Sequence, residues 1–335
     1  MMFLFRKIAI SLGFVPAMLF AQNVVTDTLP IPADTPVKIA DAATLLPPTF
    51  QQDFGLDRSS RMRVPVTVNA KGPFYFLVDT GSEATVISNE LAAVLSLSPE
   101  RRMRVASMTG TQDSPGYRID NLQLNALVLR GLLAAGLDEK NLGAAGIIGI
   151  DTLQNHKVVF DFRNGTMDIV PGKRQSRRTE AKEGEIIVSA TRRAGRLILS
   201  DATIAGRRVD LVIDTGAQSS VGNIALRDIM IARGKSRIND VVLSSVTGGF
   251  LDAQSEIIKQ IKIGGMEFAN IPVNYADGHA FRVLKLDKKP AMLLGMDALQ
   301  LFDRIEVDFA NRRVSFLLPA GGSRARRMDM LAAAQ

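Results

Sequence analysis

Cysteine and tryptophan are absent from this chain of 335 residues, and histidine occurs only twice. Without cysteine there is no disulfide framework, no thiol nucleophile, no cysteine-based metal site and no lipid-modified N-terminal cysteine. Stability must therefore come from an apolar core, and 46% hydrophobic with 22% charged residues is an ordinary globular composition. The length is enough for two domains of typical size, each with its own core.

Motifs for several common chemistries are also missing. There is no GxSxG for a serine nucleophile, and neither His156 nor His279 lies in an HExxH pattern, so both are expected to be surface or structural histidines. The stretch GAAGIIG (143–149) lacks the spacing and the following Lys-Ser/Thr of a phosphate loop, and it predicts a strand-to-helix connection instead. The sequence thus implies no metal and no cofactor.

The net charge of +7 is not organised as a binding face. Basic residues gather in PGKRQSRRTEAK (171–182) and NRRVSFLLPAGGSRARR (311–327). The chain has no basic motif with interspersed aromatic residues of the kind that binds RNA. We interpret these runs as a solvated linker and a tail, and we expect no nucleic-acid partner. The alternative, an anion or nucleic-acid binder that uses the basic runs, predicts strongly salt-dependent binding.

The first 21 residues have the layout of a secretory signal peptide. Arg6 and Lys7 precede a short apolar stretch, and Ala21 supplies a small residue for cleavage. Gly13 and Pro16 interrupt that stretch, which is shorter than the about 20 residues of a comfortable membrane span. We expect a periplasmic or secreted bacterial protein with no stable membrane insertion after cleavage; an uncleaved anchor is the alternative.

Composition and strand-like alternation divide the rest of the chain. Residues 22–55 predict a flexible lead-in or propeptide, rich in Pro, Thr, Ala and Asp. Alternating strand patterns then predict one lobe over 56–172 and a second over 187–318, joined by a linker at 173–186 and followed by a disordered tail at 319–335.

Four segments of the first half recur in the same order in the second half. GPFYFLVDTGSEATVIS (72–88) matches GRRVDLVIDTGAQSSVG (206–222), VASMTGTQDS (105–114) matches LSSVTGGFLD (243–252), AAGIIGIDTLQ (144–154) matches PAMLLGMDALQ (290–300), and KVVFDFRNGTMDI (157–169) matches RIEVDFANRRVSF (304–316). The matched positions lie 135, 138, 146 and 147 residues apart. These ordered matches indicate an internal duplication.

The duplication changes the interpretation of Asp79-Thr80-Gly81. Alone, this tripeptide is typical of a tight turn, because Asp bonds back to its own backbone and Gly accepts positive φ. A duplicated unit folds naturally about a pseudo-two-fold axis, where residues meet their own counterparts. Asp79 and Asp214 can then face one another, and two such carboxylates share one proton and titrate as a unit.

These residues resemble a retropepsin-like aspartic peptidase with two lobes fused in one chain, as in pepsin-type enzymes. The resemblance rests on LVDTGS (77–82) and VIDTGA (212–217), each followed by an apolar-apolar-Gly element at 147–149 and 293–295. It implies an all-β, two-lobed acid-protease-like fold with pseudo-two-fold symmetry and a few short helices. It also implies hydrolysis of extended polypeptide in a cleft between the lobes, and a monomer sufficient for a complete active site.

The resemblance assigns roles to the two loops. Asp79 and Asp214 would be the catalytic pair, and the supporting residues would be Thr80, Gly81, Ser82, Thr215, Gly216 and Ala217. The threonines would lock the loops together, although a β-branched residue at a strand end is an ordinary alternative. The glycines would let backbone approach the carboxylates. We hypothesise that the Ser82 hydroxyl bonds the carboxylate of Asp79 and favours its ionised form, because position 217 is alanine.

Two further segments would cover the substrate as β-hairpin flaps. They are Met108, Thr109 and Gly110 in the first repeat and Val246, Thr247 and Gly248 in the second. Glycine at a hairpin tip suits a mobile cover, and ordinary hairpins without a lid role are the alternative. Met108, Val246, Ile148 and Leu294 predict subsites for hydrophobic side chains. Asp151 and Asp297 are predicted to be helix N-caps.

A function of another class stays open. The duplicated lobes would also suit a non-catalytic peptide-binding or regulatory module, although such a module has no need of two carboxylates at that position.

Overall fold

The computed structural model describes residues 50–53, 55–56, 61–125, 127–172, 181, 183–234 and 238–319. They all belong to one compact unit, Leu46–Gln335. The expected signal peptide, most of the expected lead-in, linker and tail, and Arg174 to Arg178 of the first basic run lie outside the described residues. Within the described residues, no helix is both long enough and apolar enough to cross a membrane.

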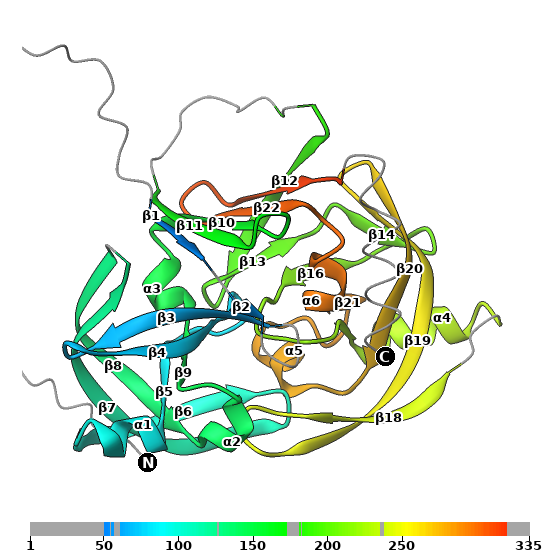
Figure 1. Cartoon of the computed structure of the whole chain (residues 1–335). Helices are drawn as coiled ribbons and strands as arrows, with labels where there is room; N and C mark the ends of the chain where they lie inside the picture. Colours follow the sequence, from blue (N-terminus) through cyan, green and yellow to red (C-terminus); the bar gives the residue numbers. More distant parts are fainter. Residues whose placement is uncertain are drawn as a thin grey trace, which may run out of the picture. The chain divides into compact units, whose positions relative to one another are not determined.

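The fold is all-β with two sheet-rich lobes and a few short helices, as the sequence predicts (Figure 1). The sheet of the N-terminal lobe has the strand order β2-β3-β4-β9-β5-β8-β7-β6. Its strands are β2 (Gly55–Leu56), β3 (Met62–Val68), β4 (Lys71–Val78), β5 (Val86–Ser88), β6 (Pro99–Ser107), β7 (Gly110–Leu124), β8 (Leu127–Leu137) and β9 (Gly146–Ile148). Its helices are α1 (Asn89–Val94), α2 (Glu139–Leu142) and α3 (Ile150–Leu153).

The C-terminal lobe repeats this plan. Its strand order runs β13-β16-β21-β17-β20-β19-β14-β15, with β18 paired to β19. The strands are β13 (Arg196–Leu199), β14 (Ala202–Ile204), β15 (Arg207–Arg208), β16 (Asp210–Ile213), β17 (Val221–Gly222), β18 (Asn239–Ser244), β19 (Phe250–Ile263), β20 (Met266–Tyr275) and β21 (Ala291–Leu294). The helices are α4 (Ile224–Ile231), α5 (His279–Val283) and α6 (Met296–Leu299).

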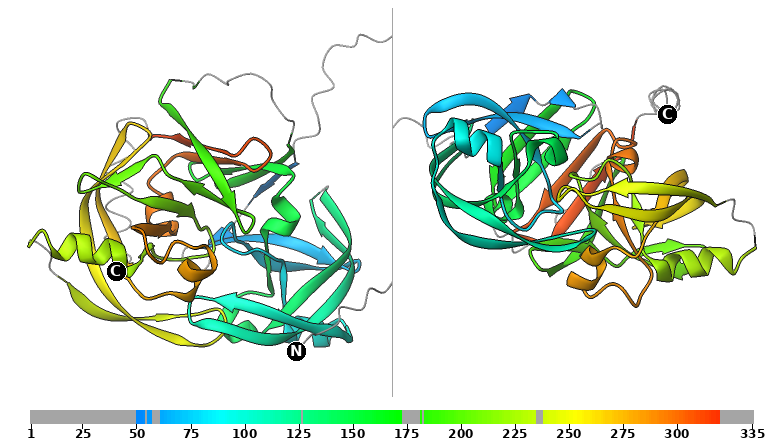
Figure 2. Two further views of the ribbon diagram at one scale, coloured as in Figure 1. Left: turned by 180° about the vertical axis from the view of Figure 1, so that it is seen from behind. Right: turned by 90° about the horizontal axis from the view of Figure 1, so that it is seen from below.

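A third group of strands comes from both halves of the chain and joins them (Figures 1 and 2). Its order is β1 (Phe50–Asp53), β11 (Thr166–Pro171), β10 (His156–Asp161), β22 (Arg304–Asp308), β23 (Arg313–Leu317) and β12 (Glu185–Arg193). At its centre β10 and β22 run antiparallel, and Val159 pairs with Glu306, its own counterpart in the repeat. The pseudo-two-fold axis therefore passes through this pair.

Two expected boundaries need correction at this junction. β1 lies inside the expected flexible lead-in and pairs with β11, and β12 begins at Glu185, inside the expected linker, and pairs with β23. Both segments lack a long alternating apolar pattern, and backbone hydrogen bonds hold them instead: β1 pairs with β11 at the edge of the sheet, and β12 pairs with β23 and β13. The second basic run is also not all tail, because Arg313 belongs to β23.

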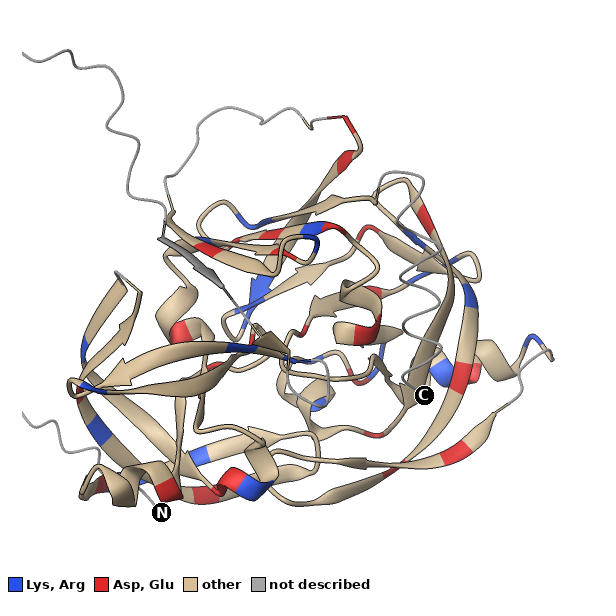
Figure 3. Cartoon of the chain, in the orientation of Figure 1, with Lys and Arg blue, Asp and Glu red and all other residues tan. Residues whose placement is uncertain are grey.

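Buried apolar strands lead to the two Asp-Thr-Gly loops. β3 alternates buried and half-buried residues, as its sequence MRVPVTV predicts. The last three residues of β4 and of β16 are instead all buried. Each of these strands pairs in parallel with a short inner strand, β9 or β21, and strands covered on both faces are continuously apolar. Charges of both signs are scattered over the described elements (Figure 3).

Candidate active site

Asp79 and Asp214 each follow the last residue of a buried strand, β4 and β16. The neighbouring inner strand fixes each one, because Asp79 N–H donates to the Ile148 carbonyl and Asp214 N–H to the Leu294 carbonyl, both at 3.0 Å. Ile148 and Leu294 belong to the repeated apolar-apolar-Gly element. This element and the Asp-Thr-Gly loop are therefore one structural unit, which explains why they recur together.

The threonines of the two loops bind across the axis with nearly identical geometry. Thr80 Oγ1 donates to the Ile213 carbonyl, and Thr215 Oγ1 donates to the Val78 carbonyl, both at 2.7 Å. Each hydroxyl also accepts from the other threonine's N–H, at 3.1 and 3.2 Å. Both side chains are buried. The four hydrogen bonds fasten the two loops to one another and fix the positions of the adjacent aspartates.

The glycines of the loops bring backbone against the opposite carboxylate. A Cβ added to Gly81 would lie 2.5 Å from Asp214 Oδ1, and a Cβ on Gly216 would overlap the carboxyl carbon of Asp79. Only glycine permits this approach. The structure thus brings together Asp79 and Asp214, which are 135 residues apart in sequence.

The environment of the two carboxylates favours protonation. Both side chains are only partly exposed to solvent. Burial raises the pKa of Asp79, and burial together with the charge of Asp79 raises the pKa of Asp214 to about 7. Backbone donors work in the opposite direction: Gly81 N–H donates to Asp79 Oδ1 at 2.7 Å, and the N–H groups of Gly216 and Ala217 donate to Asp214 Oδ1, each at 3.1 Å. One group of the pair can therefore hold a proton at a pH where an isolated carboxyl is ionised.

The hypothesis on Ser82 is wrong in its mechanism. The Ser82 hydroxyl donates to the Ala84 carbonyl at 2.8 Å and not to a carboxylate. The short reach of a serine side chain in a tight turn favours a backbone acceptor two residues ahead. Alanine at position 217 removes no hydrogen bond from the pair, because the backbone N–H of this residue, and not its side chain, donates to Asp214.

Asp151 and Asp297 are not N-caps, because Gly149 and Gly295 occupy that position of α3 and α6. Asp151 instead accepts from the N–H and the hydroxyl of Thr85, at 3.0 and 2.8 Å, and Asp297 accepts from the same groups of Ser220. The two aspartates therefore anchor the segment that follows each Asp-Thr-Gly loop to the short helix beside it. Their equal spacing after glycine is a signal of this shared contact.

The expected flap residues lie at the tips of two hairpins, β6–β7 and β18–β19, which approach one another from the two lobes (Figure 1). Thr247 Oγ1 lies 2.8 Å from Ser107 Oγ and 3.3 Å from Thr109 Oγ1, and it also contacts Ser245 Oγ at 3.0 Å. Thr109 and Thr247 are counterparts in the repeat, so the axis passes between the hairpin tips as well. The tips are in contact with each other.

Each tip also packs on the opposite lobe. Met108 contacts an apolar cluster of the C-terminal lobe that includes Val212 and Leu293, and its carbonyl accepts from His279 N–H at 2.8 Å. Val246 packs against an apolar cluster of the N-terminal lobe that includes Leu77, while Gly248 lies against the Asn141 side chain. Gly110 begins β7, with a φ of 140°.

Two of the four residues expected to line subsites, Ile148 and Leu294, do not face the hairpin tips. Ile148 and Leu294 belong to the main core, whereas their neighbours Ile147 and Leu293 belong to the clusters that receive the hairpin tips. Side chains alternate along a strand, so a shift of one residue moves a side chain to the other face. The repeat predicted the strands β9 and β21. Their register decides which side chains face the hairpin tips.

Sequence reasoning missed two arginines beside the pair. Arg196 Nε donates to the Gly81 carbonyl, and Arg61 Nη2 donates to the Leu142 carbonyl at 2.8 Å. The two arginines are 135 residues apart, the same offset as the aspartates. Alignment at that offset is the signal that would have found them.

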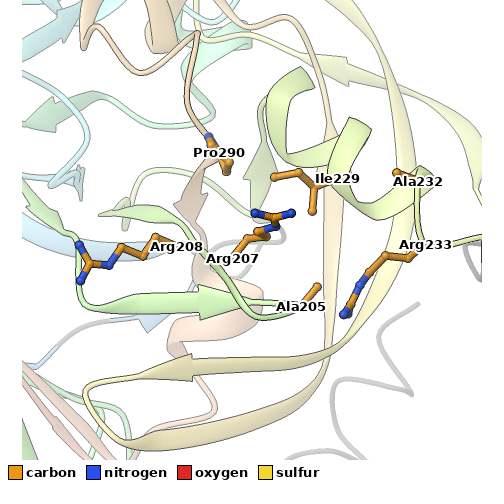
Figure 4. A pocket seen from close by; sticks show the side chains of 7 residues that line it. All are labelled: Ala205, Arg207, Arg208, Ile229, Ala232, Arg233 and Pro290. Atoms are coloured by element: carbon orange, nitrogen blue, oxygen red, sulfur yellow. The ribbon is translucent and has the colours of Figure 1, made fainter.

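A surface pocket lies away from the two aspartates. It has a volume of about 710 Å³ and is lined by residues that include Arg207, Arg233 and Pro290 (Figure 4). No carboxylate and none of the expected site residues lines it, so it offers no acid–base pair. In the described part of the chain, no group of three histidine or acidic side chains is arranged to hold a metal ion.

Comparison with known proteins found two family matches in the chain. Residues 64–155 match the family described as gag-polyprotein putative aspartyl protease, and residues 200–298 match the aspartyl protease family. Each match contains one Asp-Thr-Gly loop and its apolar-apolar-Gly element. No curated protein was found that matches the chain.

Proposed function

The chain belongs to the retropepsin-like aspartic peptidases, with two aspartyl protease domains in one polypeptide, and from this premise we propose that it is an endopeptidase that cleaves extended polypeptide with a water activated between Asp79 and Asp214. The observation that carries the proposal is the meeting of the two aspartates where the threonines of their loops bind across the axis. Protease activity in general follows from the two family domains.

The chemistry needs one ionised and one protonated carboxyl. The raised pKa values of the pair support a state that holds a single proton. The ionised carboxylate takes a proton from the water while the water oxygen bonds to the peptide carbonyl carbon. The protonated carboxyl gives its proton to the carbonyl oxygen, which gains charge in that step. Transfer of a proton to the peptide nitrogen then allows the C–N bond to break and leaves one new carboxyl and one new amine.

The hairpins support an extended substrate with apolar side chains. The two hairpin tips meet at the pseudo-two-fold axis. The backbone of a hairpin can pair there with a peptide strand. The apolar clusters that contain Ile147 and Leu293 receive Val246 and Met108 in this structure. We infer that substrate side chains of similar size and polarity bind against these clusters, and that the hairpins move to admit them.

The location and the assembly belong to the proposal as well. A signal peptide cleaved after Ala21 would place the enzyme in the periplasm or outside the cell, and this segment lies outside the described residues. Both aspartates come from one chain, so a monomer can form the whole site. We propose polypeptide as the substrate and no nucleic acid as a partner.

Peptides released from a periplasmic extract test the proposal. The extract is treated with wild type, with Asp79→Asn or with Asp214→Asn protein, and mass spectrometry compares the new peptide termini. We expect new termini with apolar residues beside the cut for the wild type alone. Equal release by wild type and both variants would overturn the proposed role of the aspartates. Binding of the same peptides by all three proteins without any cleavage would favour the binding-module alternative.

A further inference from the structure

An arginine of one lobe holds the catalytic loop of the other. Arg196 is the first residue of β13 in the C-terminal lobe, and its Nε donates to the carbonyl of Gly81 in the N-terminal lobe. Its Nη1 is buried and has no hydrogen-bond partner among the described residues. The side chain is only partly exposed. A guanidinium in such a position is fixed in place and incompletely paired.

Arg196 holds the carbonyl of the residue that contacts both carboxylates. Gly81 N–H donates to Asp79 Oδ1 at 2.7 Å. The same residue lies so close to Asp214 that an added Cβ would be 2.5 Å from its Oδ1. A single residue therefore connects Arg196 to both members of the pair. The carbonyl and the N–H of Gly81 belong to adjacent peptide units, so Arg196 acts on the hydrogen bond to Asp79 through the backbone of Gly81.

The counterpart of Arg196 makes a contact within its own lobe. Arg61 donates to the Leu142 carbonyl at 2.8 Å. The charge of Arg196 lowers the pKa of both carboxylates, and the charge of Arg61 lowers the pKa of Asp79 to a smaller extent. The charge of Asp79 raises the pKa of Asp214. The hydrogen bond of Arg196 thus joins the two lobes beside the pair.

We propose that Arg196 is a positioning residue for the aspartate pair. It fixes the Gly81 carbonyl of the opposite lobe and places a permanent positive charge near both carboxylates. This charge sets the pH range in which the pair holds a single proton. The consequence for catalysis rests on the proposed function, whereas the effect of the charge on the two carboxylates does not.

The sign of the effect follows from electrostatics. A nearby positive charge stabilises each ionised form of the pair, so each proton leaves at a lower pH. This effect opposes the burial that raises the pKa of both groups. Arginine stays protonated throughout the accessible pH range, so its contribution does not itself titrate. Removal of the charge shifts both proton losses to higher pH, by about 1 pH unit for a cation near a partly buried pair.

A carboxyl titration measures this directly in the full chain. Aspartate is labelled with ¹³C at the side-chain carboxyl, and the signals of Asp79 and Asp214 are assigned from their loss in Asp79→Asn and Asp214→Asn proteins. The titration is recorded for wild type, Arg196→Met, Arg196→Lys and the matched counterpart Arg61→Met. Thermal unfolding identifies the pH range in which each variant is folded, and only that range is compared.

We expect Arg196→Met to raise both titration midpoints by about 1 pH unit, because the charge acts on both groups. Arg196→Lys retains the positive charge but loses the planar guanidinium group, and its titration midpoints should lie close to those of the wild type. Arg61→Met should move the titration less, because the charge of Arg61 lowers the pKa of Asp79 less than the charge of Arg196 does. Midpoints equal to wild type in folded Arg196→Met, or a shift as large in Arg61→Met, would overturn the proposal.

The pH dependence of kcat/KM then separates this inference from the proposed function. With an active wild type, both limbs of the profile in Arg196→Met should move to higher pH, a change that loss of structure alone would not produce. A carboxyl titration that shifts as expected in a protein without peptidase activity would support the role of Arg196 while the proposed function failed. An active enzyme whose limbs stay in place in Arg196→Met would contradict the role of Arg196 and leave the proposed function intact.

Discussion

The N-terminal and C-terminal lobes differ in the contacts around their Asp-Thr-Gly loops. Gly81 N–H donates to Asp79 Oδ1 at 2.7 Å, whereas Gly216 N–H donates to Asp214 Oδ1 at 3.1 Å. Arg196 donates to the Gly81 carbonyl of the opposite lobe, and its counterpart Arg61 donates to the Leu142 carbonyl of its own lobe.

Contacts between counterpart residues at the axis are nearly the same in both directions. The threonine hydroxyls donate at 2.7 Å each way, Thr109 lies next to Thr247, and Val159 pairs with Glu306. The comparison teaches that pseudo-symmetry constrains the groups that meet their own counterparts. Groups away from the axis are free to differ, and these differences give the two aspartates unequal surroundings.

Among changes that leave both aspartates in place, alanine at the loop glycines should have the largest effect on activity. Gly216→Ala and Gly81→Ala each place a methyl group against the opposite carboxylate. We expect kcat/KM to fall by about 10²-fold or more, because a displacement of about 1 Å in the reacting groups has a cost of that size. Gly216→Ala should be the worse variant, since its Cβ would overlap the carboxyl carbon. Steady-state kinetics checks this, and near-wild-type activity in either variant would contradict the close approach.

Replacement of Thr80 or Thr215 by valine tests whether the hydrogen bonds across the axis stabilise both loops equally. Thr80→Val and Thr215→Val each remove one donor and one acceptor and leave buried backbone groups without partners. We expect each to lower the free energy of unfolding by about 2–4 kcal/mol, by similar amounts in the two lobes. Urea unfolding measures the loss, and Thr80→Ser, which retains the hydroxyl, serves as the control. Unequal losses would show that the cross-axis contacts are not equivalent.

The pH dependence of the free energy of unfolding tests the raised pKa of Asp214. The pKa of Asp214 is raised to about 7 from an ordinary 3.8. A carboxyl with a raised pKa binds more protons in the native than in the unfolded state, so its contribution to stability decreases as the pH rises between these values. Asp214→Asn should make the decrease in unfolding free energy from about pH 4 to about pH 7 smaller by about 2 kcal/mol. An unchanged slope in the urea unfolding series would contradict the raised pKa.

The smallest effect is expected at the one difference inside the repeated loops. The Ser82 hydroxyl donates to the Ala84 carbonyl, so its removal leaves the hydrogen bonds to Asp79 in place. Ser82→Ala should keep the pH profile of kcat/KM at its wild-type position. A shift of the acidic limb would mean that this hydroxyl acts on the carboxylate after all.

The duplication made much of the fold and the pair predictable. Four ordered matches predicted two lobes and the meeting of Asp79 with Asp214, because symmetry brings counterparts together. Which residue of the short buried run Ile147-Ile148-Gly149 faces the hairpins depends on strand register, which the sequence of such a run does not reveal. β1 was missed, and the start of β12 was placed two residues late, because backbone pairing and not an apolar pattern holds these residues. Arg196 was missed because a single arginine carries no signal until the repeat is aligned at 135 residues.

The rates of three variants test the central claim, that Asp79 and Asp214 act as one unit, most directly. The full chain is prepared as Asp79→Asn, as Asp214→Asn and as the double variant, and kcat/KM is measured on one peptide. Each single change should lower the rate by about 10³-fold or more, and the double variant should be no slower than the worse single variant. Losses that multiply in the double variant, or a single variant with wild-type rate, would contradict a shared catalytic pair.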